Sequence, residues 1–466
     1  MSGGSVQPSR APTSPIDFWH GLLRADVELT PAFCADLSAQ MRAKRLTFDD
    51  RVHCPFLRPF FIDEADETRV RPVAETIAVL GERVVEAALA SHEILAQVGL
   101  SAQEARLARI EPGYKLASTA SRLDAFLLPD SLQFAEYNAE SPAGLGYAET
   151  LAEVFRGLPI MARFEQRFRV DSYPLSSTIL NALLASYQDW GGTSSKPTIA
   201  IVDWREVPTW SEFEILRERF EARGISALVC DPRDLVFDGR ALSAQGRKID
   251  LVYRRVLIND IVSHPSDCNA LVRAYEARAV CVANTLRCKI PHKKAFFAVL
   301  TDEQNEKLFS AGEHKLIRQH VPWTRRLQDT RTRRNGETIE LLKYLRANRE
   351  NFVMKPNDEY GGTGVTLGWE TDAQAWDAAI QKALAEPQNA WVVQERIKVR
   401  RETFPHSDVQ GNVTMRDMLV DFAPYLFRGK LAGYLCRLSA TGLANVTSGG
   451  GQVPAFRVSP RVSDSL

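Results

Sequence analysis

The sequence lacks the features that mark secreted, membrane-spanning and nucleic-acid-binding proteins. Its seven cysteines are an odd number without a C-x-x-C pair, which favours reduced thiols over a disulfide framework. No segment reaches the roughly 18 consecutive apolar residues of a membrane span, and the polar first residues lack a signal-peptide core. Basic and acidic residues number 58 each, so nothing favours nucleic acid or an acidic membrane as a partner. We expect a cytoplasmic protein with a disordered tail over residues 1–15.

Two common nucleotide-binding motifs are also absent. The chain has no G-x-G-x-x-G fingerprint, which argues against a dinucleotide site, and no Walker A loop of the form G-x-x-x-x-G-K-[ST]. The apolar content of 45% and charged content of 25% are ordinary for a soluble globular protein. Because 466 residues exceed what a single hydrophobic core supports, we expect about three domains.

The stretch from Arg122 to Asn138 is the most informative part of the chain. Two apolar runs, Ala125 to Leu128 and Leu132 to Ala135, flank a Pro-Asp-Ser turn and predict an antiparallel hairpin. Side chains two residues apart on a strand share a face. Polar side chains therefore come together on a hairpin whose surroundings we expect to be dry.

These polar side chains suit a magnesium site. Arg122 and Asp124 share a face of the first strand, and Glu136 and Asn138 share a face of the second. Two carboxylates on a packed sheet require a cation, and two carboxylates with an amide oxygen suit Mg²⁺ carried on phosphate oxygens. The arginine would face a transferring phosphoryl group. A solvated charged face is the alternative interpretation.

Helices and a small α/β unit are predicted around this hairpin. Residues 16–110 are predicted to form a helical scaffold, and residues 147–187 are again helical. The scaffold includes a long helix whose apolar stripe comprises Val73, Ile77, Leu80, Val84, Ala88 and Leu95. Strands at Thr198–Val202, Ala227–Cys230 and Ile249–Tyr253, with a helix at Ser211–Arg223, predict a parallel Rossmann-like unit.

Two arginines follow the last of these strands. Ligands of open α/β sheets bind beyond the carboxyl ends of the strands. Arg254 and Arg255 therefore form a candidate clamp for a substrate carboxylate. A surface salt-bridge cluster is the alternative at this position.

The last third of the chain carries a second constellation. The strand Phe352–Pro356 contains Lys355 and is followed by a turn with Gly361, Gly362 and Gly364, a pattern typical of a phosphate lid. Lys294, at the start of a predicted helix, is a second candidate for the phosphates. The strand Trp391–Ile397 predicts a hinge at which Gln394 and Glu395 meet an adenine edge.

The order of these motifs resembles the ATP-grasp ligases, in which the metal carboxylates normally follow the nucleotide half. Here they precede it by about two hundred residues. That order is characteristic of the circularly permuted ATP-grasp group, and the chain resembles the synthetase domain of glutathionylspermidine synthase from about Glu111 to Val458. The resemblance implies that Asp124, Glu136 and Asn138 bind Mg²⁺. It also implies that Arg122 stabilises the transferred phosphoryl group and that Lys294 and Lys355 bind the ATP phosphates.

The C-terminal segment predicts two antiparallel strands joined at Arg428-Gly429-Lys430. Arg437, on the returning strand, is positioned like the arginine that the superfamily uses near the phosphate or acyl phosphate. Asp421 and Asn445 would be metal ligands in an unpermuted interpretation. No acidic residue lies between Arg437 and Asn445, so we prefer the N-terminal triad.

The resemblance implies an α+β fold: a circularly permuted ATP-grasp fold with an inserted Rossmann-like domain and a helical N-terminal segment. We assign residues 16–110 to the helical segment, 111–192 to the metal-binding portion, 193–290 to the Rossmann-like domain and 291–466 to the nucleotide-binding portion. The expected function is an ATP- and Mg²⁺-dependent carboxylate–amine ligase that forms an amide through an acyl phosphate. The alternatives are a small-molecule kinase and a non-catalytic nucleotide-binding scaffold. The partners would be a small carboxylate and an amine, and neither glutathione nor spermidine is carried over.

Overall fold

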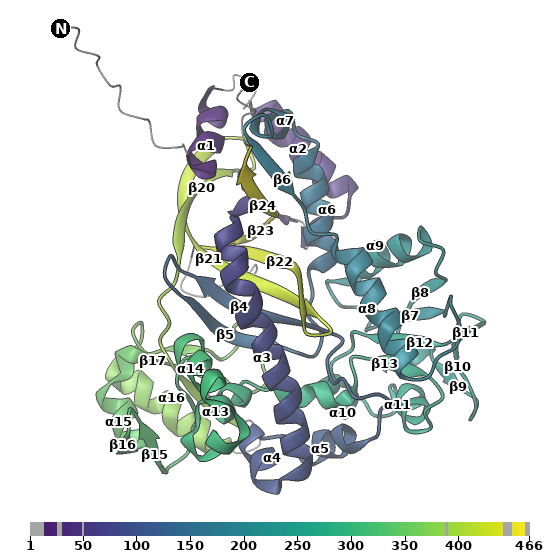
Figure 1. Cartoon of the computed structure of the whole chain (residues 1–466), viewed down its shortest axis with the longest axis vertical. Helices are drawn as coiled ribbons and strands as arrows, with labels where there is room; N and C mark the ends of the chain where they lie inside the picture. Colours follow the sequence, from purple (N-terminus) through teal and green to yellow (C-terminus); the bar gives the residue numbers. More distant parts are fainter. Residues whose placement is uncertain (1–13, 26–29, 49–50, 387–389, 441–449, 462–466) are drawn as a thin grey trace, which may run out of the picture.

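A computed structural model describes residues 14–25, 30–48, 51–386, 390–440 and 450–461, which form a mixed α+β structure (Figure 1). The helices are α1 (Pro15–Ala25), α2 (Pro31–Ala43), α3 (Glu64–Ala90), α4 (His92–Val98), α5 (Ala102–Arg109), α6 (Leu145–Arg156), α7 (Pro159–Phe164), α8 (Leu175–Asp189), α9 (Trp210–Glu221), α10 (Ile258–Ser263), α11 (Asn269–Glu276), α12 (Lys289–His292), α13 (Ala295–Thr301), α14 (Ala311–His320), α15 (Leu341–Ala347) and α16 (Ala373–Ala385). The strands are β1 (Thr47–Phe48), β2 (Arg51–Val52), β3 (Phe60–Ile62), β4 (Ala120–Leu127), β5 (Leu132–Asn138), β6 (Phe168–Asp171), β7 (Ile199–Val202), β8 (Ala227–Cys230), β9 (Val236–Phe237), β10 (Leu242–Ala244), β11 (Arg247–Ile249), β12 (Leu251–Arg254), β13 (Cys281–Ala283), β14 (Thr324–Arg326), β15 (Arg331–Arg334), β16 (Glu337–Glu340), β17 (Phe352–Pro356), β18 (Thr366–Leu367), β19 (Trp391–Glu395), β20 (Arg401–Ser407), β21 (Val413–Phe427), β22 (Lys430–Ser439), β23 (Gly451–Val453) and β24 (Ala455–Pro460).

The largest sheet joins segments from both ends of the chain. Its six strands run in the order β23-β22-β21-β4-β5, with β20 also paired to β21. The pairing of β4 with β21 places Arg122 opposite Tyr425. The predicted carboxylate hairpin and the predicted C-terminal strand pair therefore lie side by side, about three hundred residues apart in sequence (Figure 1).

The predicted hairpin is confirmed. Strands β4 and β5 pair antiparallel, and the backbone N–H of Leu128 donates to the carbonyl of Ser131 to close the turn. Asp124 lies opposite Glu136, and Arg122 opposite Asn138. The four polar residues of the sequence prediction are thus adjacent across one strand pair.

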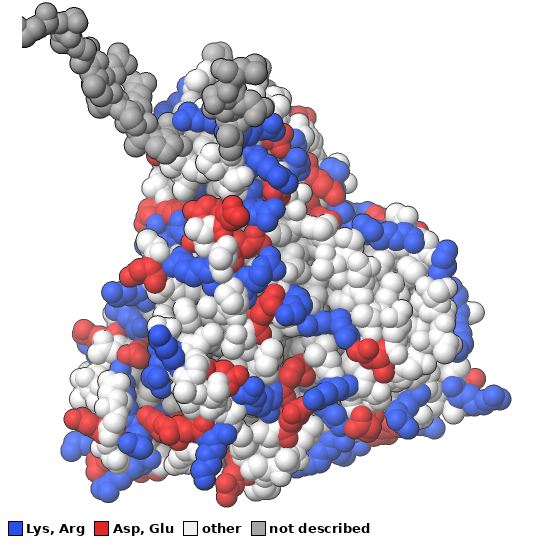
Figure 2. All heavy atoms as spheres, viewed as in Figure 1, with Lys and Arg blue, Asp and Glu red and all other residues white. Residues whose placement is uncertain are grey.

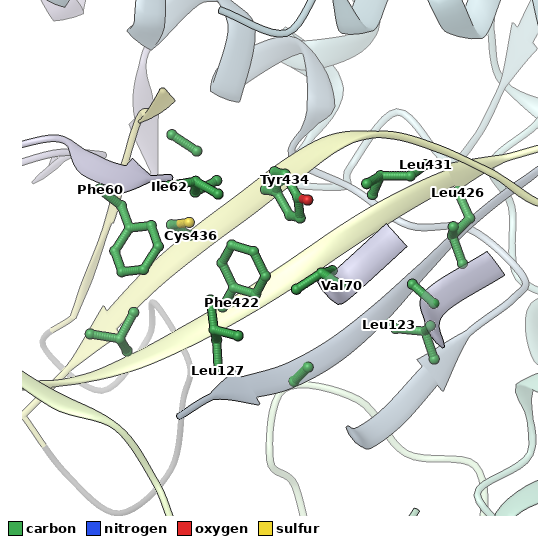
Figure 3. Close-up of a cluster of buried hydrophobic side chains, with 14 of the residues drawn as sticks. Phe60, Ile62, Val70, Leu123, Leu127, Phe422, Leu426, Leu431, Tyr434 and Cys436 are labelled. Carbon is green, nitrogen blue, oxygen red and sulfur yellow. The ribbon is translucent and has the colours of Figure 1, made fainter. Parts of the chain in front are cut away.

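Helix α3 covers one face of this sheet (Figure 1). Asp63 caps its N-terminus by accepting a hydrogen bond from the backbone N–H of Asp66, and three acidic residues in the first turn favour that end of the helix dipole. Figure 3 shows Val70 of α3 against Phe422 of β21 and Tyr434 of β22. Burial of such apolar side chains stabilises the contact by roughly 2 kcal/mol for each large residue.

The apolar stripe is confirmed along α3 but ends earlier than predicted. Val73, Ile77, Leu80, Val84 and Ala88 are buried on α3. Leu95 is also buried but belongs to α4, because Ser91 interrupts the helix and caps α4 through the backbone N–H of Ile94.

The prediction that residues 16–110 are wholly helical is wrong in part. Strands β1 and β2 form a small antiparallel pair, and β3 pairs in parallel with β24 from the C-terminal segment. Strand β24 also pairs with β6, which interrupts the second region predicted as helical. These strands are too short for an alternation pattern to show in the sequence.

The parallel α/β unit is confirmed as a four-stranded sheet in the order β13-β12-β7-β8. All three strand pairings are parallel, and α9 connects β7 to β8.

In the predicted nucleotide portion, a second four-stranded sheet has the order β14-β19-β17-β18. Its strand β17 has the bounds predicted from the sequence, and all three pairings in that sheet are antiparallel. The boundaries assigned to the four portions stay predictions.

The exposed face in Figure 2 carries lysine and arginine interspersed with aspartate and glutamate. All seven cysteines are buried and free. Among the described helices, none combines the length and apolar character that crossing a bilayer requires.

Candidate active site

One cavity of about 740 Å³ is lined by residues on or beside the six-stranded sheet, the parallel four-stranded sheet and the sheet β14-β19-β17-β18. It is lined by residues of the carboxylate hairpin, of the loop after it, of the parallel unit, of the nucleotide portion and of the C-terminal strands. The predicted site residues on its wall are Arg122, Asp124, Glu136, Asn138, Arg255, Lys294, Lys355, Gly361, Gly362, Gln394, Glu395 and Arg437. Motifs scattered over more than three hundred residues therefore surround one space.

A chain of ion pairs between two arginines and two aspartates lines part of the cavity. The Nε of Arg122 donates to Oδ1 of Asp124 at 2.8 Å, and Nη2 of Arg437 donates to its Oδ2 at 2.7 Å. Burial opposes the ionised form of Asp124, but the two guanidinium groups hold its pKa well below the usual range. Arg437 also donates from Nε to Asp421 at 2.6 Å.

Asp421 was set aside as a metal ligand in the sequence interpretation, yet it lies in the same cavity. It pairs in register with Arg437 on the neighbouring strand. Burial raises its pKa to about 6, with Arg437 acting in the opposite direction. Asn445 lies outside the described residues.

The other two members of the predicted metal triad have oxygens available. The Glu136 carboxylate forms one ion pair among the described residues, with Lys294, whose Nζ lies 3.6 Å from its Oε1. The Asn138 amide makes no side-chain hydrogen bond among the described residues. No group of three His, Cys, Asp or Glu side chains within the described ranges is arranged to hold a metal by itself. The donor set fits Mg²⁺ that shares its coordination with phosphate oxygens.

Two lysines face the same space from the nucleotide portion. The buried Nζ of Lys355 donates to Oε1 of Gln394 at 2.6 Å and to the carbonyl of Ala135 at 3.2 Å. Burial lowers the pKa of Lys355 to about 8, although Glu136 acts in the opposite direction. The Nζ of Lys294 donates to the carbonyl of Glu359 at 2.5 Å. Both cations lie beside the glycine-rich turn with only weak internal charge compensation.

The glycines of that turn have backbone conformations that other residues avoid. The φ angles of Gly361, Gly362 and Gly364 are 65°, 79° and 74°. A Cβ on Gly364 would approach Cγ of Pro356 to 2.7 Å, so this position also requires glycine for space. The turn connects β17 to β18, so its predicted place between two strands is confirmed, whereas its role as a phosphate lid stays a prediction.

The predicted adenine hinge is partly occupied by the protein itself. The backbone N–H of Glu395 donates to the carbonyl of Trp323, and that of Arg396 donates to the carbonyl of Asn351. The Glu395 side chain forms an ion pair with Arg334 at 2.6 Å. Backbone donors at these two positions are therefore unavailable to a purine, whereas Gln394 and Glu395 still line the cavity.

The two arginines predicted to clamp a substrate carboxylate have internal partners. Arg254 is fully buried, pairs with Glu140 at 3.3 Å and does not line the cavity. Arg255 lines the cavity, but its terminal nitrogens donate to the carbonyls of Ser141 and Pro142 and to the hydroxyl of Tyr253. This geometry does not favour a bidentate clamp at either residue.

A largely buried ion network next to the glycine-rich turn was not predicted from the sequence. Asp358, three residues before Gly361, pairs with Lys289 at 2.7 Å and with Lys293. Lys289 also pairs with Glu140 at 3.0 Å, and the pKa of Glu140 lies near 2 because the surrounding cations outweigh burial. Proximity in sequence to the hairpin and to the turn was the available signal for Glu140 and Asp358.

A carboxylate hairpin that meets two lysines and a glycine-rich β-turn across antiparallel sheets defines an ATP-grasp architecture, here with its halves in reversed chain order. A family model described as circularly permuted ATP-grasp type 2 matches residues 129–446. The chain belongs to this family, and membership implies ATP use. The match includes Glu136 and Asn138 and begins after Asp124.

Two relatives have the name "Putative glutamate–cysteine ligase", with suffixes 2-2 in Frankia casuarinae and 2-3 in Frankia alni. They are 23% identical over 332 residues and 24% identical over 335 residues. Each match covers 68% of this chain and 35% of the relative, so the chain spans about a third of the length of these relatives.

A solved structure supports the same fold. A glutathione synthetase-like effector (GSS30) from Globodera pallida, in its apo form, superposes with a TM-score of 0.58 at 12% identity. The match covers 91% of this chain and 96% of the effector. This likeness concerns the fold alone. The more specific resemblance to glutathionylspermidine synthase stays a prediction.

Proposed function

We propose that the protein is an ATP-dependent carboxylate–amine ligase that activates an acid as an acyl phosphate and releases ADP and phosphate. One observation carries the proposal: Glu136 and Asn138 of the hairpin share a cavity with Lys294, Lys355 and Arg437. A fold can be held together without such a convergence of charges, whereas phosphoryl transfer depends on it.

The charges present fit a magnesium-bound nucleotide. Lys355 is half-buried and forms no ion pair among the described residues, so anionic phosphate oxygens would supply the negative counter-charge that its ammonium group lacks. The open oxygens of Glu136 and Asn138 are hard ligands of the type that Mg²⁺ prefers. When bound with the nucleotide, Mg²⁺ would neutralise phosphate charge during transfer.

In this proposal the protein positions groups and supplies charge. Lys294 and Lys355 bind phosphate oxygens, and the glycine-rich turn covers them with backbone N–H groups. Arg122 and Arg437, fixed by their shared contact with Asp124, offer their positive charge to the transferring phosphoryl group and then to the acyl phosphate. The cavity admits the amine, which attacks the acyl carbon and displaces phosphate.

The names of the relatives suggest the first substrates to test. Since both are named as glutamate–cysteine ligases, L-glutamate and L-cysteine are the first acid and amine that we propose for assay.

The decisive assay uses hydroxylamine as a surrogate amine. Wild-type protein with ATP, Mg²⁺, hydroxylamine and either glutamate or a small-metabolite extract should form ADP and a hydroxamate together. Lys355→Met should reduce both by about a hundredfold or more, the usual scale for loss of one charge stabiliser. Lys382→Met, at an exposed position of α16, is the matched control and should leave the rate unchanged.

Other outcomes separate the alternatives. ADP together with a stable phosphorylated metabolite would indicate a kinase. ATP binding without either product would indicate a nucleotide-binding scaffold. Hydroxamate formation that persists in Lys355→Met would contradict the proposed role of this lysine.

A further inference from the structure

The cavity has a second, acidic end formed by the parallel unit. Asp203 follows β7, Asp260 lies on α10, and both line the cavity opposite the nucleotide portion. Val207, Pro208 and Leu257 complete the wall with apolar surface. This end takes no part in the phosphate chemistry proposed above.

Neither carboxylate is neutralised by an ion pair in the described part of the chain. Asp203 is 8% exposed, and its Oδ1 accepts a hydrogen bond from the backbone N–H of Trp204 at 2.9 Å. Its other oxygen, and both oxygens of Asp260, have no partner in the described residues. A buried carboxylate without a cation is costly, which suggests that a ligand supplies one.

The nearest cation does not serve as that partner. The terminal nitrogens of Arg255 are used by the loop at residues 141–142 and by Tyr253. Burial raises the pKa of Asp203 to about 6; the charges of Arg255 and Arg254 oppose the increase, and that of Asp260 adds to it. The buried Nε of Arg255 has no hydrogen-bond partner among the described residues. This unused donor therefore lines the same part of the cavity as two carboxylates that have three unused oxygens among the described residues.

This end lies one loop away from the phosphoryl site. Arg122 donates from Nη1 to the carbonyl of Ala143 at 2.9 Å, whereas Arg255 holds the carbonyls of the two preceding residues. Ser141 returns a hydrogen bond from its hydroxyl to the carbonyl of Arg255 at 2.8 Å. A molecule bound beside Asp203 would thus reach toward Arg122 along the surface of this loop.

We propose that Asp203 and Asp260 bind the ammonium group of the amine substrate and that one of these carboxylates takes its proton before the nitrogen attacks the acyl carbon, with a carbonyl oxygen of the same molecule accepting from Nε of Arg255. The assignment rests on the proposed ligase function. It specifies in addition that the amine substrate of this ligase is positively charged when it binds. It predicts selection for cationic amines over uncharged isosteres of the same size.

Saturation-transfer NMR with glycinamide and glycolamide tests the assignment. Glycinamide carries an ammonium group and a carbonyl oxygen, and glycolamide replaces the ammonium with a hydroxyl. With Mg²⁺ and a non-hydrolysable ATP analogue present at pH 7.5, wild-type protein should transfer saturation to glycinamide at least fivefold more strongly than to glycolamide.

Substitution of the carboxylates should remove this preference. Asp203→Asn and Asp260→Asn should each lower the glycinamide signal at least fivefold, whereas Asp267→Asn, an exposed position of the same unit, should match wild type. If Asp203→Asn fails to fold, Asp260→Asn decides, because Asp260 is only half-buried. Equal signals for the two amides, no signal for glycinamide, or a preference kept in both variants would overturn the assignment.

The hydroxylamine assay separates this result from the proposed function. Hydroxylamine is largely uncharged at neutral pH, so it does not require an ammonium site. Hydroxamate formation without a glycinamide preference would retain the ligase and reject the ammonium site. A glycinamide preference lost in the variants, without hydroxamate formation, would retain the site and reject the ligase.

Discussion

Individual residues in the cavity carry charges that form no ion pair within the described ranges of the chain. Lys355 has its pKa lowered to about 8, and Asp203 has its pKa raised to about 6, in both cases mainly because of burial. Desolvation of an unpaired charge disfavours the folded state, and such charges concentrate at functional sites. These two residues mark opposite ends of the same cavity, one suited to phosphate and one to a cation.

Asp203 should therefore reduce stability at neutral pH. Its folded-state pKa lies above the usual value of 3.8, so the folded state holds the proton while the unfolded state has released it. This contribution grows as the pH rises from about 4 to about 6 and is complete above that range. Asp203→Asn should raise the stability at pH 7.5 by up to about 3 kcal/mol, and by almost nothing below pH 4.

Thermal unfolding of the variant and of wild type at pH 4 and pH 7.5 provides the measurement. Asp267→Asn is the control for loss of a carboxylate at the surface and should show little change at either pH. A variant that is no more stable than wild type at pH 7.5 would show that the carboxylate is not strained by burial.

At the scale of elements, the glycine-rich turn is tied to helix α12 by charge. Asp358 lies between β17 and the turn, and it pairs with Lys289 at the start of α12. Lys289 in turn pairs with Glu140, which lies two residues after the hairpin strand β5. The network thus connects the carboxylate hairpin with the glycine-rich turn.

Removal of the central cation, Lys289, should leave the buried carboxylate of Glu140 and the half-buried carboxylate of Asp358 poorly compensated. Lys289→Met is expected to lower stability by about 3–5 kcal/mol, the range observed when one partner of a buried ion pair is deleted. It should also raise the KM for ATP, because the turn loses its anchor. Unfolding curves and ATP titrations of the initial rate measure the two effects.

The matched control is Lys382→Met, which removes a lysine from an exposed position of α16. It should change neither quantity. A Lys289→Met protein with wild-type stability would indicate that Arg254 and Lys293 alone compensate Glu140 and Asp358.

At the scale of the whole molecule, strand pairing brings together segments that the permuted chain order separates in the sequence. Strand β4 reaches β21 at Arg122 and Tyr425, and that contact completes the cavity. The nucleotide portion and the parallel unit close the cavity from other directions. A nucleotide bound there would contact parts of the chain that have separate local cores.

Magnesium and ATP should therefore stabilise the folded protein as a whole. At a nucleotide concentration of about one hundred times the Kd, the expected gain is about 2.7 kcal/mol. Thermal unfolding with and without Mg·ATP measures it. Chelation of Mg²⁺ by EDTA should remove most of the gain, and Lys355→Met should show little gain at the same ATP concentration.

A gain that persists in EDTA would contradict the role of Glu136 and Asn138 as metal ligands. A gain of equal size in Lys355→Met would place the nucleotide elsewhere on the protein.

Local patterns account for the parts of the fold that were predicted correctly. The Pro-Asp-Ser turn and its flanking apolar runs determined the β4–β5 hairpin, and strand–helix–strand spacing determined the parallel unit. Both patterns depend on neighbours within a few tens of residues. Short strands such as β3 and β6 were missed, because their pairing with β24 depends on distant chain.

The sequence by itself determined the candidates for the site: residue type and spacing identify the polar side chains of the hairpin, the two lysines and the glycine-rich turn, most of which line one cavity. Only the tertiary structure decided how these side chains are used. It placed Arg254 in an internal ion pair, joined Asp421 and Asp124 through Arg437, and left Asp203 without an ion pair among the residues that the structure describes. The physical reason is that desolvation and ion pairing depend on which groups meet in space, and contacts across three hundred residues leave no local pattern.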